Sequence, residues 1–195
     1  MYKHVIKRLF DILIGLVVLP FVLLLAIVIG PIIYFTDKGP VFYNGERIGR
    51  HGKMFKMFKF RSMYVNAPDI RLDSGATFNA DDDPRVTPIG RFIRKTSIDE
   101  VPQFLNVLIG DMSFVGPRPD TPDFLHIYEE ENPIILTIRP GITGYNQAYF
   151  RNSISGKEKR NNDEYYTKNM TFWLDVKIVF KTVSAVLLRK NVNRE

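Results

Sequence analysis

The sequence contains no cysteine. This absence excludes disulfide bonds, thiolate catalysis and cysteine-ligated zinc, and it is compatible with a cytoplasmic location. Histidine is scarce too, and His4, His51 and His126 lack metal-ligand spacing, so we interpret them as surface or interface residues. The chain has no P-loop motif, internal repeat or low-complexity segment. It also lacks any nucleic-acid-binding module, so no nucleic acid partner is expected.

Charged side chains are missing from residues 12 to 35. As a helix, this run is long enough to cross the ~30 Å hydrocarbon core of a bilayer. Pro20 and Gly30-Pro31 predict a helix-break-helix, with a bend near Pro20 and a break at the far end. Basic residues flank both ends, so charge gives no orientation for a span. A re-entrant segment, with an Arg8–Asp11 ion pair at the interface, fits both features; a single span or a signal anchor is the alternative.

The remaining length is enough for one domain. Of 195 residues, about the first 36 serve the membrane, so we predict an anchor over residues 1–36 and a cytoplasmic catalytic domain over residues 37–195. The formal net charge of +6 suits nucleic acid or an anionic leaflet, and the hydrophobic anchor favours the leaflet.

Asp99 and Glu100 are adjacent carboxylates. Neighbours on a helix project about 100° apart, so the two can flank one substrate from two sides. One carboxylate can act as a nucleophile that forms an acyl-phosphate, and the other can act as a base or bind a metal. Alternatively, Thr96 or Ser97 caps a helix whose first turn carries acids because of the helix dipole. Pro102 resembles a first-turn proline, so we expect the acids at a helix start, within two short helical pieces over residues 87–106.

Basic and aromatic residues alternate after the apolar run. Asn44-Gly45 predicts a hairpin turn, and a second turn is expected near residues 49–52. The following segment, residues 53–61, is typical of a strand. Either its lysines form a solvated face, or Lys59 and Arg61 lie near a phosphate or a lipid headgroup.

Two arginines lie in stiff proline-containing turns. Arg118 belongs to Gly116-Pro117-Arg118-Pro119, and Arg139 opens Arg139-Pro140-Gly141. A rigid arginine is a good bidentate phosphate ligand, although one of the two is expected merely to pair with a surface acid. The acid-rich stretch over residues 69–85 is typical of a solvated loop, with a magnesium role as the alternative.

The C-terminal segment has helical periodicity. Residues 169–190 carry Trp173, Val176, Phe180 and Val183 along one side. This pattern fits a core helix or an amphipathic helix lying in the membrane interface.

Taken together, these motifs resemble those of the monotopic polyprenol-phosphate phosphoglycosyl transferases of the bacterial sugar transferase family, in a short form that has the catalytic unit only. The similarity covers nearly the whole chain. It rests on Lys7-Arg8-Asp11, the proline-containing apolar run, Lys59-Phe60-Arg61-Ser62-Met63, Asp83-Pro84-Arg85, Ser97 to Gln103, Asn106-Val107, Gly110 to Ser113, Gly116 to Pro119 and Arg139 to Gly144. One difference is Leu19-Pro20, where some small members have Ser-Pro.

The resemblance implies a two-step transfer. Asp99 would attack the β-phosphorus of a UDP-sugar and release UMP, and polyprenol (undecaprenyl) phosphate would then accept the phosphosugar, as the first membrane step of glycoconjugate assembly. Glu100 would orient or deprotonate the lipid phosphate, and Mg²⁺, touching Asp99, would neutralise the diphosphate. The implied substrate-binding candidates are Lys59, Arg61, Arg85, Arg118 and Arg139.

The sequence thus predicts an α+β, mainly helical fold with a re-entrant N-terminal membrane segment and an interfacial C-terminal helix. The expected location is the cell membrane, with the active site on its inner, cytoplasmic face. Expected partners are UDP-sugar, polyprenol phosphate and glycosyltransferases of the same pathway. Two alternatives remain: a lipid-phosphate hydrolase that uses the same acids, and a non-catalytic membrane-anchored scaffold.

Overall fold

The computed structural model describes residues 2–70, 80, 82–150 and 154–187. Within these ranges helices dominate and the strands form two small sheets, in agreement with the predicted α+β, mainly helical class. The longer elements are α1 Lys7–Asp37, β1 Phe42–Ile48, β2 Met54–Phe60, α2 Pro88–Lys95, α3 Gln103–Ile109, β3 Ser113–Val115, α4 Leu125–Glu131, β4 Gly141–Thr143, α5 Tyr145–Tyr149, α6 Gly156–Asn169 and α7 Phe172–Leu187. Short helical turns cover Tyr2–Ile6, Arg50–Gly52, Ile98–Glu100, Pro122–Phe124 and Pro133–Thr137.

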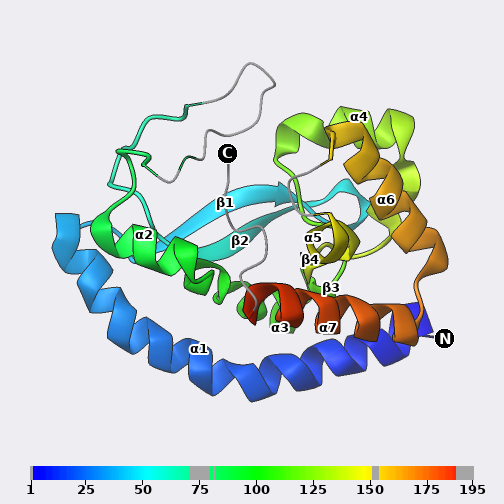
Figure 1. Cartoon of the computed structure of the whole chain (residues 1–195), viewed down its shortest axis with the longest axis horizontal. Coiled ribbons are helices and arrows are strands. Elements are labelled where there is room, and N and C mark those ends of the chain that lie inside the picture. Colours follow the sequence, from blue (N-terminus) through cyan, green and yellow to red (C-terminus); the bar gives the residue numbers. More distant parts are fainter. Residues whose placement is uncertain (1, 71–79, 81, 151–153, 188–195) are drawn as a thin grey trace.

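Helix α1 is one continuous curved helix that runs along the whole domain (Figure 1). The predicted break at Gly30-Pro31 is wrong, because the helix continues to Asp37. Pro20 is exposed, and because it has no backbone N–H, one hydrogen bond to the carbonyl in the preceding turn is missing. This accounts for the curvature of the helix without ending it. The buried residues of α1 recur on one side, which faces the domain. They are Lys7, Asp11, Gly15, Val22, Ile29, Gly30 and Ile33.

Polar contacts attach both ends of α1 to the domain. Near its start, Lys7 forms a buried ion pair with Asp175, the first acid of α7. At its last residue, Asp37 accepts hydrogen bonds from Arg61 after β2. The predicted Arg8–Asp11 ion pair is not formed: Arg8 donates to backbone carbonyls of α3, and Asp11 accepts from Ser113 and Phe114.

The outer face of α1 is apolar and exposed. Val17 is 80% exposed and Ile27 is 72% exposed. Helices α2, α3 and α7 lie on the side of the domain that faces α1 (Figure 1). Helix α7 has both features: it buries Ile178 in a core cluster and exposes Trp173 and Phe180 on its outer side. Length and hydropathy alone would allow α1 to cross a membrane.

Strands β1 and β2 form an antiparallel hairpin. The turn predicted at Asn44-Gly45 is wrong, because these residues pair with Phe58 and Met57 inside the sheet. The chain turns instead between Gly49 and Lys53, as the second turn signal predicted. Continued pairing with β2 therefore outweighs the local turn preference.

Strands β3 and β4 are parallel and short. A β-carbon on Gly141 would lie 2.1 Å from the backbone nitrogen of Gly116, so only glycine allows this close approach. The turns that carry Arg118 and Arg139 lie against each other, because the backbone N–H of Gly141 donates to the carbonyl of Pro117. Their side chains have different partners: Arg118 binds Glu100, whereas Arg139 binds the carbonyl of Gly110. The two stiff turns therefore serve different surroundings.

Candidate active site

Asp99 and Glu100 lie in a 3₁₀ turn, Ile98–Glu100, just before α3. Ser97 precedes it in the left-handed region with φ 57°, an uncommon conformation for a residue other than glycine. Neither Thr96 nor Ser97 caps α3 with its side chain, and Pro102 is the residue immediately before the helix. The acids thus precede α3 instead of occupying its first turn.

Glu100 is held by two cations from different segments. Lys59 Nζ donates to Glu100 Oε1 at 2.7 Å, and Arg118 Nη2 donates to the same oxygen at 2.6 Å. Arg118 Nη1 reaches Oε2 at 3.3 Å, so the guanidinium contacts both carboxylate oxygens. The Arg118 side chain is 38% exposed whereas that of Glu100 is 23% exposed, so solvent reaches this group from the arginine side.

Asp99 differs from its neighbour. Its carboxylate accepts no hydrogen bond from any residue that the structure describes, although Lys59, Arg94 and Arg118 lie close enough to favour its charge. Burial raises the pKa of Asp99 to about 6, and the charge of Glu100 raises it further against the effect of these cations. The oxygens of Asp99 therefore remain available to an incoming group.

The cations around Glu100 determine its chemistry. Burial opposes its ionisation, but Arg118 and Lys59 outweigh burial and hold its pKa far below the usual range. A carboxylate stabilised in this way is a weak base. Burial also lowers the pKa of Lys59, while Glu100 counteracts that shift.

A buried amide connects β2, which carries Lys59, to α3, the helix that follows Glu100. Asn106 of α3 accepts from the backbone N–H of Phe58 and donates to the backbone carbonyl of Lys56, so it fastens β2 to α3. Sequence reasoning did not assign it this role, although Asn106-Val107 belongs to the motifs. It also missed Arg94, whose signal is a basic residue in the last turn of the helix before the acids.

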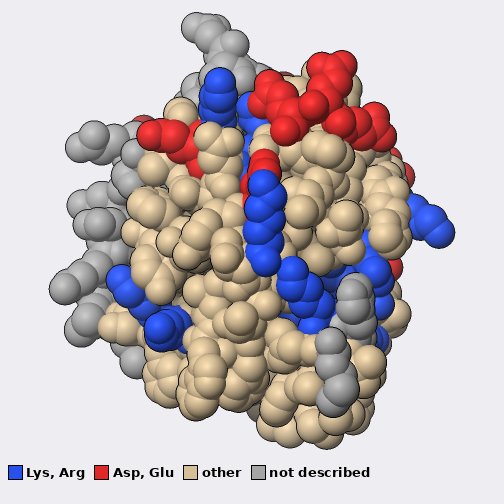
Figure 2. Space-filling model, turned by 90° about the vertical axis from the view of Figure 1, so that its right-hand side faces the viewer, with Lys and Arg blue, Asp and Glu red and all other residues tan. Residues whose placement is uncertain are grey.

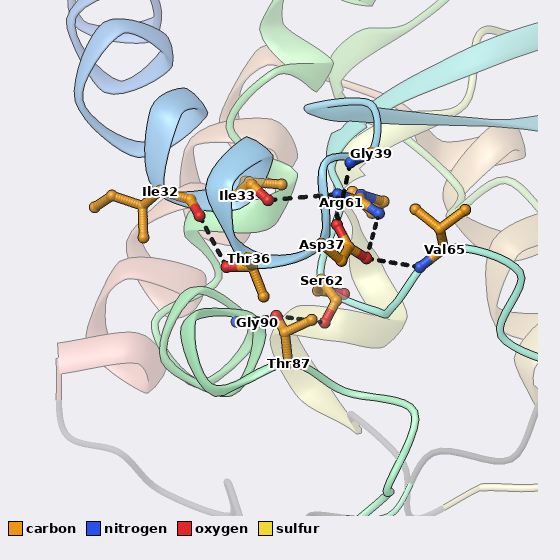
Figure 3. Close-up of polar contacts among 10 residues, drawn as sticks. All are labelled: Ile32, Ile33, Thr36, Asp37, Gly39, Arg61, Ser62, Val65, Thr87 and Gly90. Carbon is orange, nitrogen blue, oxygen red and sulfur yellow. Dashed lines mark hydrogen bonds and ion pairs between the residues drawn. The ribbon is translucent and has the colours of Figure 1, made fainter.

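Arg61 lies apart from the acid pair, in a polar cluster at the end of α1 (Figure 3). It donates through Nη1 and Nη2 to the two carboxylate oxygens of Asp37 and also reaches the carbonyl of Ile33. Asp37 accepts from the backbone of Val65 as well. This arrangement attaches the last turn of α1 to the chain that follows β2.

Arg85 is also buried in a local ion pair. Its Nε and Nη2 donate to the carboxylate of Asp83, and its Nη1 donates to the carbonyl of Pro68. Asp83 is fully buried, and Arg85 keeps the pKa of this carboxyl low against the effect of burial. Much of the acid-rich stretch, including Asp73 and Asp81, lies outside the described residues.

Arg139 lies at the other end of α3 from the acids. Its Nε donates to the carbonyl of Gly110, which follows the last residue of α3. Of the five predicted substrate-binding cations, the structure therefore brings Lys59 and Arg118 to Glu100, and it places Arg61, Arg85 and Arg139 elsewhere.

The residues fit a magnesium ion that is shared with a substrate. No group of three or more metal-ligating side chains occurs in the described part of the chain. Magnesium, however, is commonly bound by one or two carboxylates together with substrate phosphates and water. Asp99 offers such a carboxylate, whereas Lys59 and Arg118 occupy that of Glu100.

Comparison with known proteins gives a consistent result. The family model described as "Bacterial sugar transferase" matches residues 2–189. Undecaprenyl-phosphate galactose phosphotransferase of Salmonella typhimurium is 40% identical over 94% of this chain and 41% of its own length. UDP-N-acetylgalactosamine-undecaprenyl-phosphate N-acetylgalactosaminephosphotransferase of Aeromonas hydrophila is 40% identical over 93% of this chain and 44% of its own length. Exopolysaccharide production protein ExoY of Rhizobium meliloti is 40% identical over 94% of this chain and 86% of its own length. The chain thus spans less than half the length of the first two relatives.

Proposed function

The chain belongs to the bacterial sugar transferase family, and from this premise we propose that it transfers a phosphosugar from a UDP-sugar to polyprenol phosphate. Relatives named for undecaprenyl-phosphate sugar transfer and for exopolysaccharide production support this choice of substrates and a role in glycoconjugate assembly. The observation that carries the proposal is the contrast between two adjacent acids. Glu100 is held by two cations, whereas Asp99 accepts no hydrogen bond from the described residues.

In the first step, a carboxylate oxygen of Asp99 attacks the β-phosphorus of the UDP-sugar. The bond from that phosphorus to the bridging oxygen breaks, and UMP leaves with the electron pair. In the second step, an oxygen of polyprenol phosphate attacks the same phosphorus. The bond to Asp99 breaks, which regenerates the carboxylate and gives polyprenyl diphosphosugar.

The cations around Glu100 stabilise the transferring group. Charge spreads over the phosphoryl oxygens in the transition state, so fixed positive groups there lower the barrier. Arg118 and Lys59 are fixed by Glu100 and remain next to Asp99. When bound at Asp99, Mg²⁺ would add charge neutralisation of the diphosphate. Because Glu100 is a weak base here, its role is to orient these cations and, through them, the lipid phosphate.

The lipid substrate has a matching surface. A shallow apolar groove of about 540 Å³ lies between the C-terminal half of α1 and the start of β1. Ala26 and Val41, which line it, pack in the same cluster as Ile98, the residue before Asp99. One hydrophobic cluster therefore connects this groove to the residue before the acid pair.

The contacts of α1 favour a helix that stays in one leaflet. Its start, middle and end all contact the same domain, through Lys7, Gly15 and Asp37. If α1 crossed the bilayer, the polar contacts at its two ends would lie on opposite sides of the ~30 Å hydrocarbon core, with the domain inside it. We therefore propose a re-entrant anchor with the site at the cytoplasmic face, where UDP-sugars are found.

Nucleotide release tests the reaction directly. Purified enzyme mixed with a UDP-sugar and Mg²⁺, without lipid acceptor, should release UMP in an amount equal to the enzyme. Glu100→Gln should still release UMP in an amount equal to the enzyme, but more slowly, and it should also slow the transfer to lipid, because Lys59 and Arg118 lose the anion that holds them. A hydrolase would release nucleotide continuously and a scaffold would release none, so either result would contradict the proposal.

Thiol labelling tests the topology, because the natural chain has no cysteine. Single cysteines replacing Lys3 and the exposed Lys157 should both resist an impermeant thiol reagent in intact cells and react after lysis. Labelling of position 3 in intact cells would show that the chain crosses the bilayer and would overturn the re-entrant anchor.

A further inference from the structure

Three arginines from distant segments meet near the C-terminal end of α3. Arg8 donates through Nη1 to the carbonyl of Val107 at 2.5 Å and through Nη2 to that of Leu108 at 2.9 Å. Arg139 Nε donates to the carbonyl of Gly110 at 2.7 Å. Arg50, in the turn between β1 and β2, donates through Nε to the carbonyl of Thr137 at 2.9 Å. These bonds fix the three guanidiniums in position.

The positive charge of this cluster is only partly matched by a nearby acid, Asp11. Among the residues that the structure describes, Arg8, Arg50 and Arg139 form no ion pair. Burial lowers the pKa of Arg139, the charges of Arg8 and Arg50 lower it further, and the charge of Asp11 opposes them without cancelling the shift. Three like charges held together are mutually unfavourable, so an anion between them would be stabilising.

The same residues line a small cleft. Its charged lining consists of Lys3, Lys7, Arg8, Asp11, Arg50 and Arg139, and it encloses about 20 Å³. Lys7 is paired with Asp175, and Asp11 Oδ1 accepts from Ser113 and Phe114. The volume accepts one or two small atoms. A phosphate oxygen could therefore enter the cleft while the rest of its molecule stays at the mouth.

The cluster is separate from the acid pair. Glu100 precedes the first residue of α3, whereas Gly110 follows the last, and a helix of this length extends about 10 Å. The pKa of Arg118 responds to the charges of Glu100, Asp99 and Asp120, whereas that of Arg139 responds to the charges of Arg8, Arg50 and Asp11. An anion bound by Arg139 would thus occupy a second site.

The surroundings indicate a lipid. Leu9 and Phe10, next to Arg8 at the start of α1, are 57% and 42% exposed and belong to its apolar outer face. Figure 2 shows the face of the molecule that carries the N-terminus: acidic side chains gather at its top, and most basic ones lie in its lower half, above an uncharged lower edge. Basic groups next to such an apolar surface lie at the level of phospholipid headgroups.

We propose that Arg8, Arg50 and Arg139 form a binding site for the phosphate of an anionic phospholipid, distinct from the site around Glu100. The outer nitrogens of Arg50 and Arg139 contact the phosphate oxygens, while their Nε groups stay bound to carbonyls. The bound headgroup attaches the N-terminal end of α1 to the membrane surface.

Binding can be measured with short-chain lipids and the whole chain in a neutral detergent. Dioctanoyl phosphatidylglycerol should raise the thermal unfolding midpoint in a saturable way, and dioctanoyl phosphatidylcholine should bind at least fivefold more weakly. The double variant Arg50→Gln/Arg139→Gln should bind phosphatidylglycerol at least tenfold more weakly than the unchanged protein.

A matched control separates this site from net charge. Lys53→Gln/Lys157→Gln removes two charges from exposed positions and should bind the lipid normally. Arg50→Gln alone gives up one carbonyl contact and should weaken binding about threefold, which keeps the test valid if the double variant unfolds. Equal loss in the lysine control would assign the effect to overall charge and overturn the proposal. Inorganic phosphate that binds as tightly as the lipid would assign the cleft to a soluble anion and overturn the lipid assignment.

Discussion

Two groups of acids and arginines in this molecule look alike in sequence and differ in their contacts. At the end of α1, both oxygens of Asp37 are bound by Arg61, and one of them also by the backbone of Val65. Before α3, Glu100 is bound by Lys59 and Arg118, but the adjacent Asp99 accepts no hydrogen bond from the described residues. The first group is satisfied within the protein, whereas the second retains one open carboxylate beside fixed cations.

This difference suits the two groups to different roles, the first to holding segments together and the second to chemistry. A buried ion pair whose groups are all bound stabilises the attachment of one segment to another, and removal of one partner leaves an uncompensated charge. An open carboxylate with a raised pKa beside cations is the arrangement expected of a nucleophile. Substitutions in the two groups should therefore change different quantities: catalysis at the unbound carboxylate and stability at the bound ion pair.

Asp99→Asn should abolish transfer, with a loss of at least ~10³-fold, because an amide does not attack phosphorus in place of a carboxylate. The unfolding midpoint should stay close to that of the unchanged protein, since no hydrogen bond to the described residues is lost. Transfer of labelled phosphosugar to lipid and thermal unfolding measure the two effects. UMP release by Asp99→Asn at the normal level would contradict the role of Asp99.

Arg61→Gln should mainly lower stability. It leaves the largely buried Asp37 carboxylate without its cation and frees the end of α1, so the free energy of unfolding should fall by ~3 kcal/mol. Activity per folded molecule should fall less than tenfold. Adding Asp37→Asn to Arg61→Gln should recover part of the stability. A large loss of activity with normal stability would place Arg61 at the substrate instead.

Arg118→Lys should lower kcat/KM by a factor that corresponds to ~2 kcal/mol, because lysine keeps the charge but cannot reproduce the two parallel contacts of a guanidinium. Arg91→Lys, at an exposed position of α2, is the matched control and should be neutral. Unchanged kinetics for Arg118→Lys would mean that Arg118 only neutralises Glu100.

Asp163→Asn should have the smallest effect, and it should act on stability alone. Asp163 is buried, with one oxygen bound to Asn146 and the other without a hydrogen-bond partner among the described residues. Burial, followed by the charge of Asp120, raises its pKa to about 7. The folded protein thus holds a proton that the unfolded chain releases above about pH 4, so this residue makes stability fall as pH rises from about 4 to about 7.

The variant should remove that pH dependence and gain ~1 kcal/mol at pH 8, measured by urea unfolding across this range. Glu130→Gln, at an exposed position, should keep the unchanged profile. A pH profile unaffected by Asp163→Asn would show that the carboxyl is ionised in the folded protein.

Local patterns in the sequence predicted several elements correctly. The apolar run, the strand after it, the two helical pieces around the acid pair and the C-terminal helix all occur near the predicted positions. These features depend on periodicity, proline and charge within a few residues. The acid pair was also proposed as the site from its neighbours in the chain alone, and this role stays a prediction.

Features that depend on distant contacts could not be predicted in this way. Asn44-Gly45 has a strong turn preference, but pairing with β2 keeps it extended. Four arginines belong to motifs that are suited to binding phosphate: Arg61, Arg85, Arg118 and Arg139. Which of them lies near Glu100 depends on where Asp37, Asp83 and Gly110 lie in the fold.

Detection of the covalent intermediate shows whether Asp99 is the nucleophile. Enzyme incubated with a UDP-sugar and Mg²⁺, without lipid acceptor, can be quenched, digested and analysed by mass spectrometry. The peptide containing Asp99 should gain the mass of one phosphosugar, fragmentation should place this group on Asp99, and polyprenol phosphate should remove it. An active enzyme whose Asp99 stays unmodified, or which carries the phosphosugar on another residue, would contradict the account.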